Sequence, residues 1–136
     1  ANYGIQKSHH HLAAGIEYSI YHDSGKETSL YFEGQMTSGL DEQERRAALA
    51  FQRDVLIGFR HALNDIMGRE FVLTSIIDTE KSSEYILTFS YRQRLTNVVS
   101  LNAGARLIDA EDDSGFGGLA ALKNSDHIFL NITYHF

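Results

Sequence analysis

The chain has 136 residues, a net charge of −6 and no cysteine, proline or tryptophan. One domain is expected over residues 1–136. The lack of cysteine excludes disulfides, cysteine-ligated zinc and thiol chemistry, and the acidic balance argues against nucleic acid as a partner. No run of about 18 apolar residues is present, so no transmembrane helix is expected.

Residues 1–10 form a polar segment that we interpret as an extension or loop. No signal peptide is recognisable in it, so an exported protein would have lost that signal or would carry it further upstream. The histidine run His9, His10 and His11 admits three interpretations: a tag remnant, a metal-binding tract and a natural loop. We favour the loop.

Alternation of apolar and polar residues with a period of two predicts several strands. Near the start, Ile16, Tyr18 and Ile20 alternate with more polar residues, and the last stretch of the chain shows the pattern most clearly. The stretches with this period are residues 16–21, 30–36, 84–95, 99–109 and 128–136.

Two further stretches are less regular. Residues 45–63 begin like a helix, but the strand period fits them better and Gly58 disfavours a helix interior. Arg53 and His61 interrupt the apolar side of this strand, near its ends. Residues 71–77 are apolar at nearly every position, so the orientation of that strand cannot be read.

Short and long links alternate between the predicted strands, as the periplasmic turns and external loops of membrane β-barrels do. The short links are residues 22–26, 64–68 and 95–97, and the long ones include residues 37–44, 78–83 and 109–125. The sequence therefore predicts an all-β fold, an antiparallel up-and-down transmembrane β-barrel with seven or eight strands from this chain. A mean hydropathy of −0.27 is compatible with that fold, since lumen-facing polar residues lower the average.

The strand count leaves the limits of the barrel open. A complete single-chain bacterial barrel has an even number of strands. Either residues 2–8 supply an eighth strand, or upstream strands are missing and the chain is the C-terminal portion of a larger barrel. We favour the larger barrel.

The final strand, residues 126–136, resembles the C-terminal signature of bacterial outer-membrane β-barrel proteins. In that family the barrel-assembly machinery recognises the terminal aromatic residue and the alternating apolar positions. Residues 53–65 also resemble a hairpin strand of porin-like proteins of gammaproteobacteria, and the likeness covers roughly residues 12–136. The absence of tryptophan departs from the usual aromatic girdle. The resemblance implies an assembly signal made of Ile128, Leu130, Ile132, Tyr134 and Phe136.

If the apolar faces contact lipid, the opposite faces form a lumen. Its acidic residues come from the N-terminal half and its arginines from residue 60 onward, an arrangement that would create a transverse field biasing ion passage. Paired charges that fill a closed interior are the alternative. The predicted lumen-facing residues are Glu17, Glu33, Gln35, Asp54, Arg60, Arg92, Arg94, Asn102, Arg106, Asn131 and His135.

Other candidate sites have weaker support. The acidic cluster of Asp109, Glu111, Asp112 and Asp113 has the oxygen ligands that calcium prefers, but its spacing does not match an EF-hand, which favours a solvated external loop. No Gly-x-Ser-x-Gly elbow is present, and the pairs at residues 22–23 and 126–127 fall in predicted turns or strand starts. We therefore expect no enzyme activity, cofactor or metal.

The function expected from the sequence is that of a porin-like barrel in the outer membrane of a Gram-negative bacterium, passing small solutes or ions passively. A non-conducting barrel with a structural, adhesion or assembly-partner role is the first alternative, and a soluble lipocalin-like barrel is the second. Expected partners are outer-membrane lipid and lipopolysaccharide, the barrel-assembly machinery during insertion, and a second copy or another membrane protein.

Overall fold

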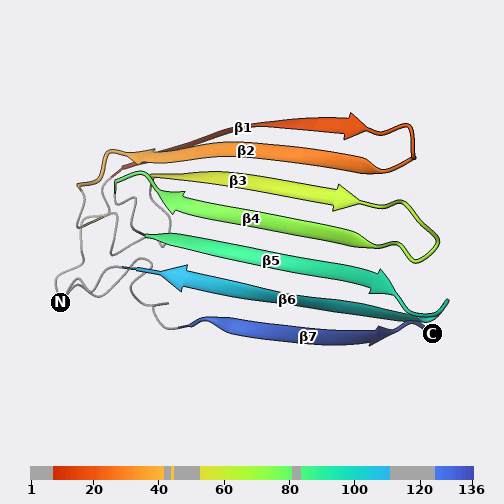
Figure 1. Cartoon of the computed structure of the whole chain (residues 1–136). Coiled ribbons are helices and arrows are strands. Elements are labelled where there is room, and N and C mark those ends of the chain that lie inside the picture. The colour runs from red at the N-terminus through yellow and green to blue at the C-terminus, as the bar shows by residue number, and fades with distance from the viewer. Residues whose placement is uncertain (1–7, 42–43, 45–52, 81–83, 111–124) are drawn as a thin grey trace.

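A computed structural model of the chain describes residues 8–41, 44, 53–80, 84–110 and 125–136. Seven strands lie side by side in one layer, and each pairs antiparallel with the next strand in the sequence (Figure 1). The prediction of an all-β, antiparallel, up-and-down arrangement is confirmed, and the sheet is open. The strands are β1 (His10–Tyr21), β2 (Glu27–Ser38), β3 (Arg53–Ala62), β4 (Glu70–Asp78), β5 (Tyr85–Arg94), β6 (Val99–Asp109) and β7 (His127–Tyr134).

The links between strands segregate to opposite ends of the sheet (Figure 1). The short turns β1–β2, β3–β4 and β5–β6 lie at one end, together with the end of β7, and we call it the turn end. The links β2–β3, β4–β5 and β6–β7 lie at the other, which we call the loop end. The predicted alternation of short and long links holds for β2–β3 (residues 39–52) and β6–β7 (residues 110–126), but not for β4–β5, whose link (residues 79–84) is shorter than that of β3–β4 (residues 63–69). The segregation of the links to two ends follows from the antiparallel order.

Local chemistry explains the tight turns. Gly25 and Gly68 adopt positive φ angles of 79° and 57°, where glycine avoids the steric cost that other residues meet. Asn64 adopts a φ of 51° and donates a hydrogen bond from Nδ2 to the carbonyl oxygen of Gly25, which ties two neighbouring turns together. Asparagine tolerates this left-handed conformation better than most residues.

Two sequence predictions about element limits change, and two others fall mostly outside the described residues. His10 and His11 belong to β1 and not to a loop, and the His11 ring lies 3.1 Å from Thr37 Oγ1 (Nδ1 to Oγ1). Thr37 belongs to β2 and not to the following link. The described part of the less regular strand begins at Arg53, and residues 45–52 lie outside the described residues. The eighth strand considered for residues 2–8 also falls almost wholly outside them.

The register places the large apolar side chains on one face, which we call the apolar face. Residues paired across an antiparallel ladder point to the same side, and the row Leu30, Phe59, Leu73, Phe89 runs through four neighbouring strands. The same pairing settles the orientation of β4, which the sequence left unread. Phe71, Leu73 and Ile77 lie on the apolar face, and Val72 and Ile76 on the other.

Among the described residues, the buried side chains lie on the face opposite the apolar face. Side chains on the apolar face are exposed: Ile16 is 71% exposed and Leu130 66%. On the opposite face Ser29 is 1% exposed and Asp54 3%. Among the described residues, the only cluster of buried apolar side chains is a small one at the loop end, where Ile86 packs with Ala110 and contacts partly buried isoleucines.

Two glycines on the face opposite the apolar face make room for aromatic rings from the adjacent strand. A Cβ on Gly58 would lie 3.1 Å from the Tyr31 ring, and a Cβ on Gly104 would collide with the Phe129 ring and the Phe89 carbonyl oxygen. Each ring therefore lies over a glycine, and the two rings occupy space on this face that no other layer of secondary structure covers among the described residues. Within the described residues, no helix has the length and hydropathy needed to cross a membrane.

Candidate functional site: the polar face of the sheet

The residues predicted to line a lumen share one face of the sheet, opposite the apolar face, which we call the polar face. The ladders place them there in every strand except β4, which supplies none of them, and a contact of 3.2 Å between Ser100 Oγ and His135 Nε2 adds the last of them. That this face lines a lumen stays a prediction. The residues are Glu17, Glu33, Gln35, Asp54, Arg60, Arg92, Arg94, Asn102, Arg106, Asn131 and His135.

A ladder of alternating charges crosses β2 to β5 at the turn end of the polar face. Arg60 donates to Glu70 Oε2 from Nη2 at 2.5 Å and from Nε at 2.8 Å. The same guanidinium lies 3.8 Å from Glu27 Oε1 through Nη1. Arg92 Nη2 lies 3.7 Å from the second oxygen of Glu70. Glu70 is therefore shared unequally, closely bound to Arg60 and only loosely to Arg92.

The ladder modifies the predicted separation of charge. Glu17, Glu33 and Asp54 lie on β1 to β3 and the arginines on β3 to β6, as the sequence indicated. Glu27 and Glu70 are not among the residues predicted from the sequence to face the lumen. Glu27 lies two residues before Ser29 in the same strand, so the period of two could have placed Glu27 on the polar face. Glu70 directly precedes residues 71–77, whose orientation could not be read from the sequence. The sequence therefore could not show that Glu70 shares a face with Arg60 and Arg92.

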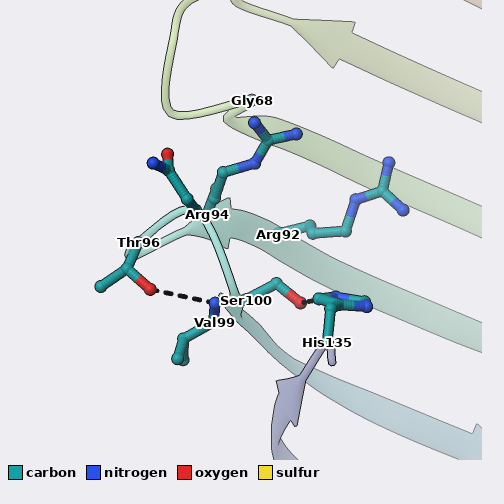
Figure 2. A pocket seen from close by; sticks show the side chains of 8 residues that line it. Gly68, Arg92, Arg94, Thr96, Val99, Ser100 and His135 are labelled. Atoms are coloured by element: carbon teal, nitrogen blue, oxygen red, sulfur yellow. Dashed lines mark hydrogen bonds between the residues drawn. The ribbon is translucent and has the colours of Figure 1, made fainter.

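A hollow of about 520 Å³ opens beside the ladder, at the turn end of the polar face. Figure 2 shows the side chains of Arg92 and Arg94 projecting from β5 beside it, with Ser100 and His135 in contact below them. None of the described residues that line it is acidic. The lining residues are Gly68, Arg92, Arg94, Thr96, Asn97, Val99, Ser100 and His135.

Two turns form the rim of this hollow. The backbone N–H of Arg94 donates to the carbonyl oxygen of Met67 at 2.7 Å, which holds the β3–β4 turn against the end of β5. In the β5–β6 turn, Thr96 Oγ1 accepts the backbone N–H of Val99 at 3.0 Å (Figure 2). Both turns therefore have fixed positions, and the hollow is bounded by backbone that is hydrogen-bonded in place.

The β3–β4 turn is also held by an ion pair. Asp65 accepts the backbone N–H of Arg69 at 3.1 Å through Oδ1 and its Nε–H at 2.5 Å through Oδ2. The backbone hydrogen bond from Arg69, followed by its side-chain bond, lowers the pKa of the Asp65 carboxyl below its ordinary value. The carboxylate form of Asp65 is therefore the form that this turn requires.

A smaller hollow of about 60 Å³ lies toward the loop end, between Glu33, Gln35, Asp54, Leu56 and Ile76. Gln35 Nε2 donates to Asp54 Oδ2 at 3.2 Å across its wall. Its size suffices for a few water molecules and not for a solute.

The remaining candidates make local hydrogen bonds or lie outside the described residues. His22 Nε2 lies 2.8 Å from Thr28 Oγ1, and Asp126 accepts the backbone N–H of Ile108 at 2.7 Å. Within the described ranges, no group of three or more histidine or acidic side chains is placed to hold a metal ion. Of the acidic cluster, Glu111, Asp112 and Asp113 lie outside the described residues.

The residues of the predicted assembly signal lie on the apolar face of β7 or follow it. Ile128, Leu130, Ile132 and Tyr134 are all more than half exposed, and the Tyr134 and Phe136 rings pack edge to face with centroids 5.2 Å apart. Their recognition by an assembly machinery stays a prediction. No family model, no curated protein and no solved structure matches the chain.

Proposed function

We propose that this sheet is part of a transmembrane β-barrel in the outer membrane of a Gram-negative bacterium, and that its polar face lines a lumen that passes small solutes or ions. One observation carries the proposal: all seven strands expose large apolar side chains on one face, while the buried polar side chains lie on the other. Soluble monomers rarely expose contiguous apolar patches larger than a few hundred Å². Acyl chains are the environment in which such a face is stable.

The height of the apolar band fits a bilayer. On β3 the band is bounded by Arg53, which pairs with Glu80 at 3.3 Å, and by His61, which lies 2.9 Å from Thr28 Oγ1. Eight residue steps of about 3.3 Å, tilted by about 40°, give a band about 20 Å high. Outer-membrane barrels carry an apolar band of about 25 Å. The polar residues that interrupt the strand's alternation would thus lie near the two membrane surfaces.

The open edges support a barrel larger than this sheet. Within the described residues, the outer edges of β1 and β7 have no strand partner. In a bilayer each unpaired backbone group costs several kcal/mol, so both edges require partners. Strands β1 and β7 both run from the loop end to the turn end, so direct pairing between them would be parallel. Antiparallel closure requires an odd number of further strands, from the same polypeptide or from another chain.

The ladder of charges favours a second candidate, a barrel that does not conduct. Glu27, Arg60, Glu70 and Arg92 partly neutralise one another, and the Tyr31 and Phe129 rings occupy space on the same face. Such an interior would be filled by its own side chains, as in narrow barrels. The protein would then act through its loops, as a structural or adhesion protein. The proposed lipid, lipopolysaccharide and assembly-machinery contacts are the same in both cases.

Two measurements test these functions. Detergent extraction with heat-dependent migration on a gel tests the membrane barrel, and a protein recovered without detergent would instead indicate a soluble barrel. Single-channel recording in planar bilayers tests conduction. Arg92→Glu should shift the reversal potential in a salt gradient toward cations, whereas Lys26→Glu, the same charge change in the β1–β2 turn, should shift it less. A silent but correctly inserted protein would favour the non-conducting barrel.

A further inference from the structure

The hollow at the turn end of the polar face has the chemistry of an anion site. Arg94 makes no ion pair with any residue that the structure describes, and Arg92 shares Glu70 with the more closely bound Arg60. Two guanidinium groups therefore face the hollow, and the only described carboxylate near either of them is that of Glu70, 3.7 Å from Arg92. Positive charge that the protein leaves unneutralised attracts an anionic ligand, most strongly in a concave site.

The donors have the geometry that oxyanions require. A guanidinium group presents a planar set of N–H donors that matches the oxygens of phosphate or carboxylate. Both arginines project from the same strand to the same side (Figure 2). Ser100 and His135 contact each other at 3.2 Å and contribute a hydroxyl and an imidazole to the same wall. The site therefore combines two guanidinium groups from β5 with a hydroxyl from β6 and an imidazole from the residue that follows β7.

The surroundings hold these groups in place. The Arg94 backbone is fixed by its hydrogen bond to Met67, and Ser100 follows a turn capped by Thr96. A volume of about 520 Å³ exceeds what inorganic phosphate fills, which leaves room for a phosphate that carries a small organic group. The hollow lies on the polar face, so the groups that would enclose a ligand face away from the apolar band.

We propose that this hollow binds a small phosphate-bearing solute through Arg92 and Arg94. The inference deepens the proposed function and rests on it for the lumen by which the solute reaches the site. Such a site would concentrate phosphorylated solutes at the turn-end mouth of the lumen and favour their entry over that of neutral molecules.

The test is calorimetric titration of inorganic phosphate into the intact protein in detergent micelles, with glucose phosphate as a second ligand. Arg94→Gln should weaken binding about tenfold, and Arg94→Lys, which keeps the charge without the fork, should have a smaller effect. The matched control is Arg106→Gln, which removes the same charge from the neighbouring strand, outside the hollow. It should change the dissociation constant by less than about twofold. Heat-dependent gel migration verifies that each variant is folded.

Three results would overturn the proposal: no phosphate binding, equal losses in Arg94→Gln and Arg106→Gln, or displacement of phosphate by equimolar chloride. The last two would indicate a diffuse positive surface. Failure of the proposed function has a separate signature. Phosphate binding that depends on Arg94 in a protein without conductance would refute passage and leave the site intact, whereas conductance without binding would do the reverse.

Discussion

Leu73→Arg tests whether the apolar face contacts acyl chains. Leu73 lies near the middle of β4, between Phe59 and Phe89 in the register, and it is 41% exposed. In water, a substitution at so open a position changes the free energy of unfolding by about 0.5 kcal/mol or less. In a bilayer, an arginine on the lipid face near the midplane costs about 2–4 kcal/mol. The two environments thus predict effects that differ several-fold.

The matched control is Thr74→Arg, one residue along the same strand and on the polar face, where Thr74 pairs with Gly58 and Thr88. Unfolding from phosphatidylcholine vesicles in urea, followed by circular dichroism and gel migration, measures both variants. With a slope of about 2 kcal/mol per molar urea, Leu73→Arg should lower the midpoint by about 1–2 M. Thr74→Arg should lower it by less than about 0.5 M. If Leu73→Arg does not insert at all, Leu73→Asn gives a smaller and measurable loss.

The refuting result is a larger loss for Thr74→Arg than for Leu73→Arg. That order would mean that the polar face is packed against protein and that the apolar face meets water or a mobile partner. Equal small losses in both variants would also refute lipid contact.

Three further predictions concern the polar face and its turns. Gly104→Ala should destabilise the protein by about 1–3 kcal/mol in the same urea assay, because the new Cβ meets the Phe129 ring and the Phe89 carbonyl oxygen, whereas Gly34→Ala, with open space around its Cβ, should not. Glu70→Gln should cost about 1–3 kcal/mol, since Glu70 is only 15% exposed and binds Arg60 closely, while Glu33→Gln at an exposed site should cost far less. Carboxyl NMR should show Asp65 titrating below its ordinary pKa of 3.8. Because this pKa is lowered, the stabilisation of the turn by the Asp65 carboxylate is present above the unfolded-state pKa and is lost as pH falls through the folded-state pKa. Arg69→Gln should return the pKa of Asp65 toward 3.8, and an unchanged pKa would contradict this role for Arg69.

Most of the fold followed from alternation, and the part that did not has a local cause. The strands with one apolar and one polar face were readable because a period of two separates the faces. Strand β4 was not, because Ile76 on its polar face packs with the buried Ile86 cluster at the loop end. In the sequence, an apolar residue that packs in that cluster cannot be distinguished from an apolar residue on the apolar face. Only the pairing with Phe59 and Phe89 distinguishes them.

The site was predictable residue by residue but not as an arrangement. Alternation placed Arg60, Arg92 and Arg94 on the polar face, yet which acid neutralises which arginine depends on the stagger of three ladders. Glu70 reaches Arg60 and Arg92 because it pairs directly with Arg92 and lies diagonally across from Arg60. The hollow likewise depends on a hydrogen bond between the Met67 carbonyl oxygen, in the turn before β4, and the N–H of Arg94 at the end of the neighbouring strand β5. No short-range pattern encodes that contact.

The register also explains how one polar face persists through all seven strands. Apolar-face positions are even-numbered in β1 and β2, odd-numbered in β3 to β6, and even-numbered again in β7. Both changes of parity fall in long links, between β2 and β3 and between β6 and β7. Since a shift of one residue turns every side chain of a strand to the opposite face, the length of a short turn is constrained by the faces it must match. The links β2–β3 and β6–β7 are long enough to absorb such a shift, so the three hairpins at the turn end keep matched faces and hold their charged side chains on one side of the sheet.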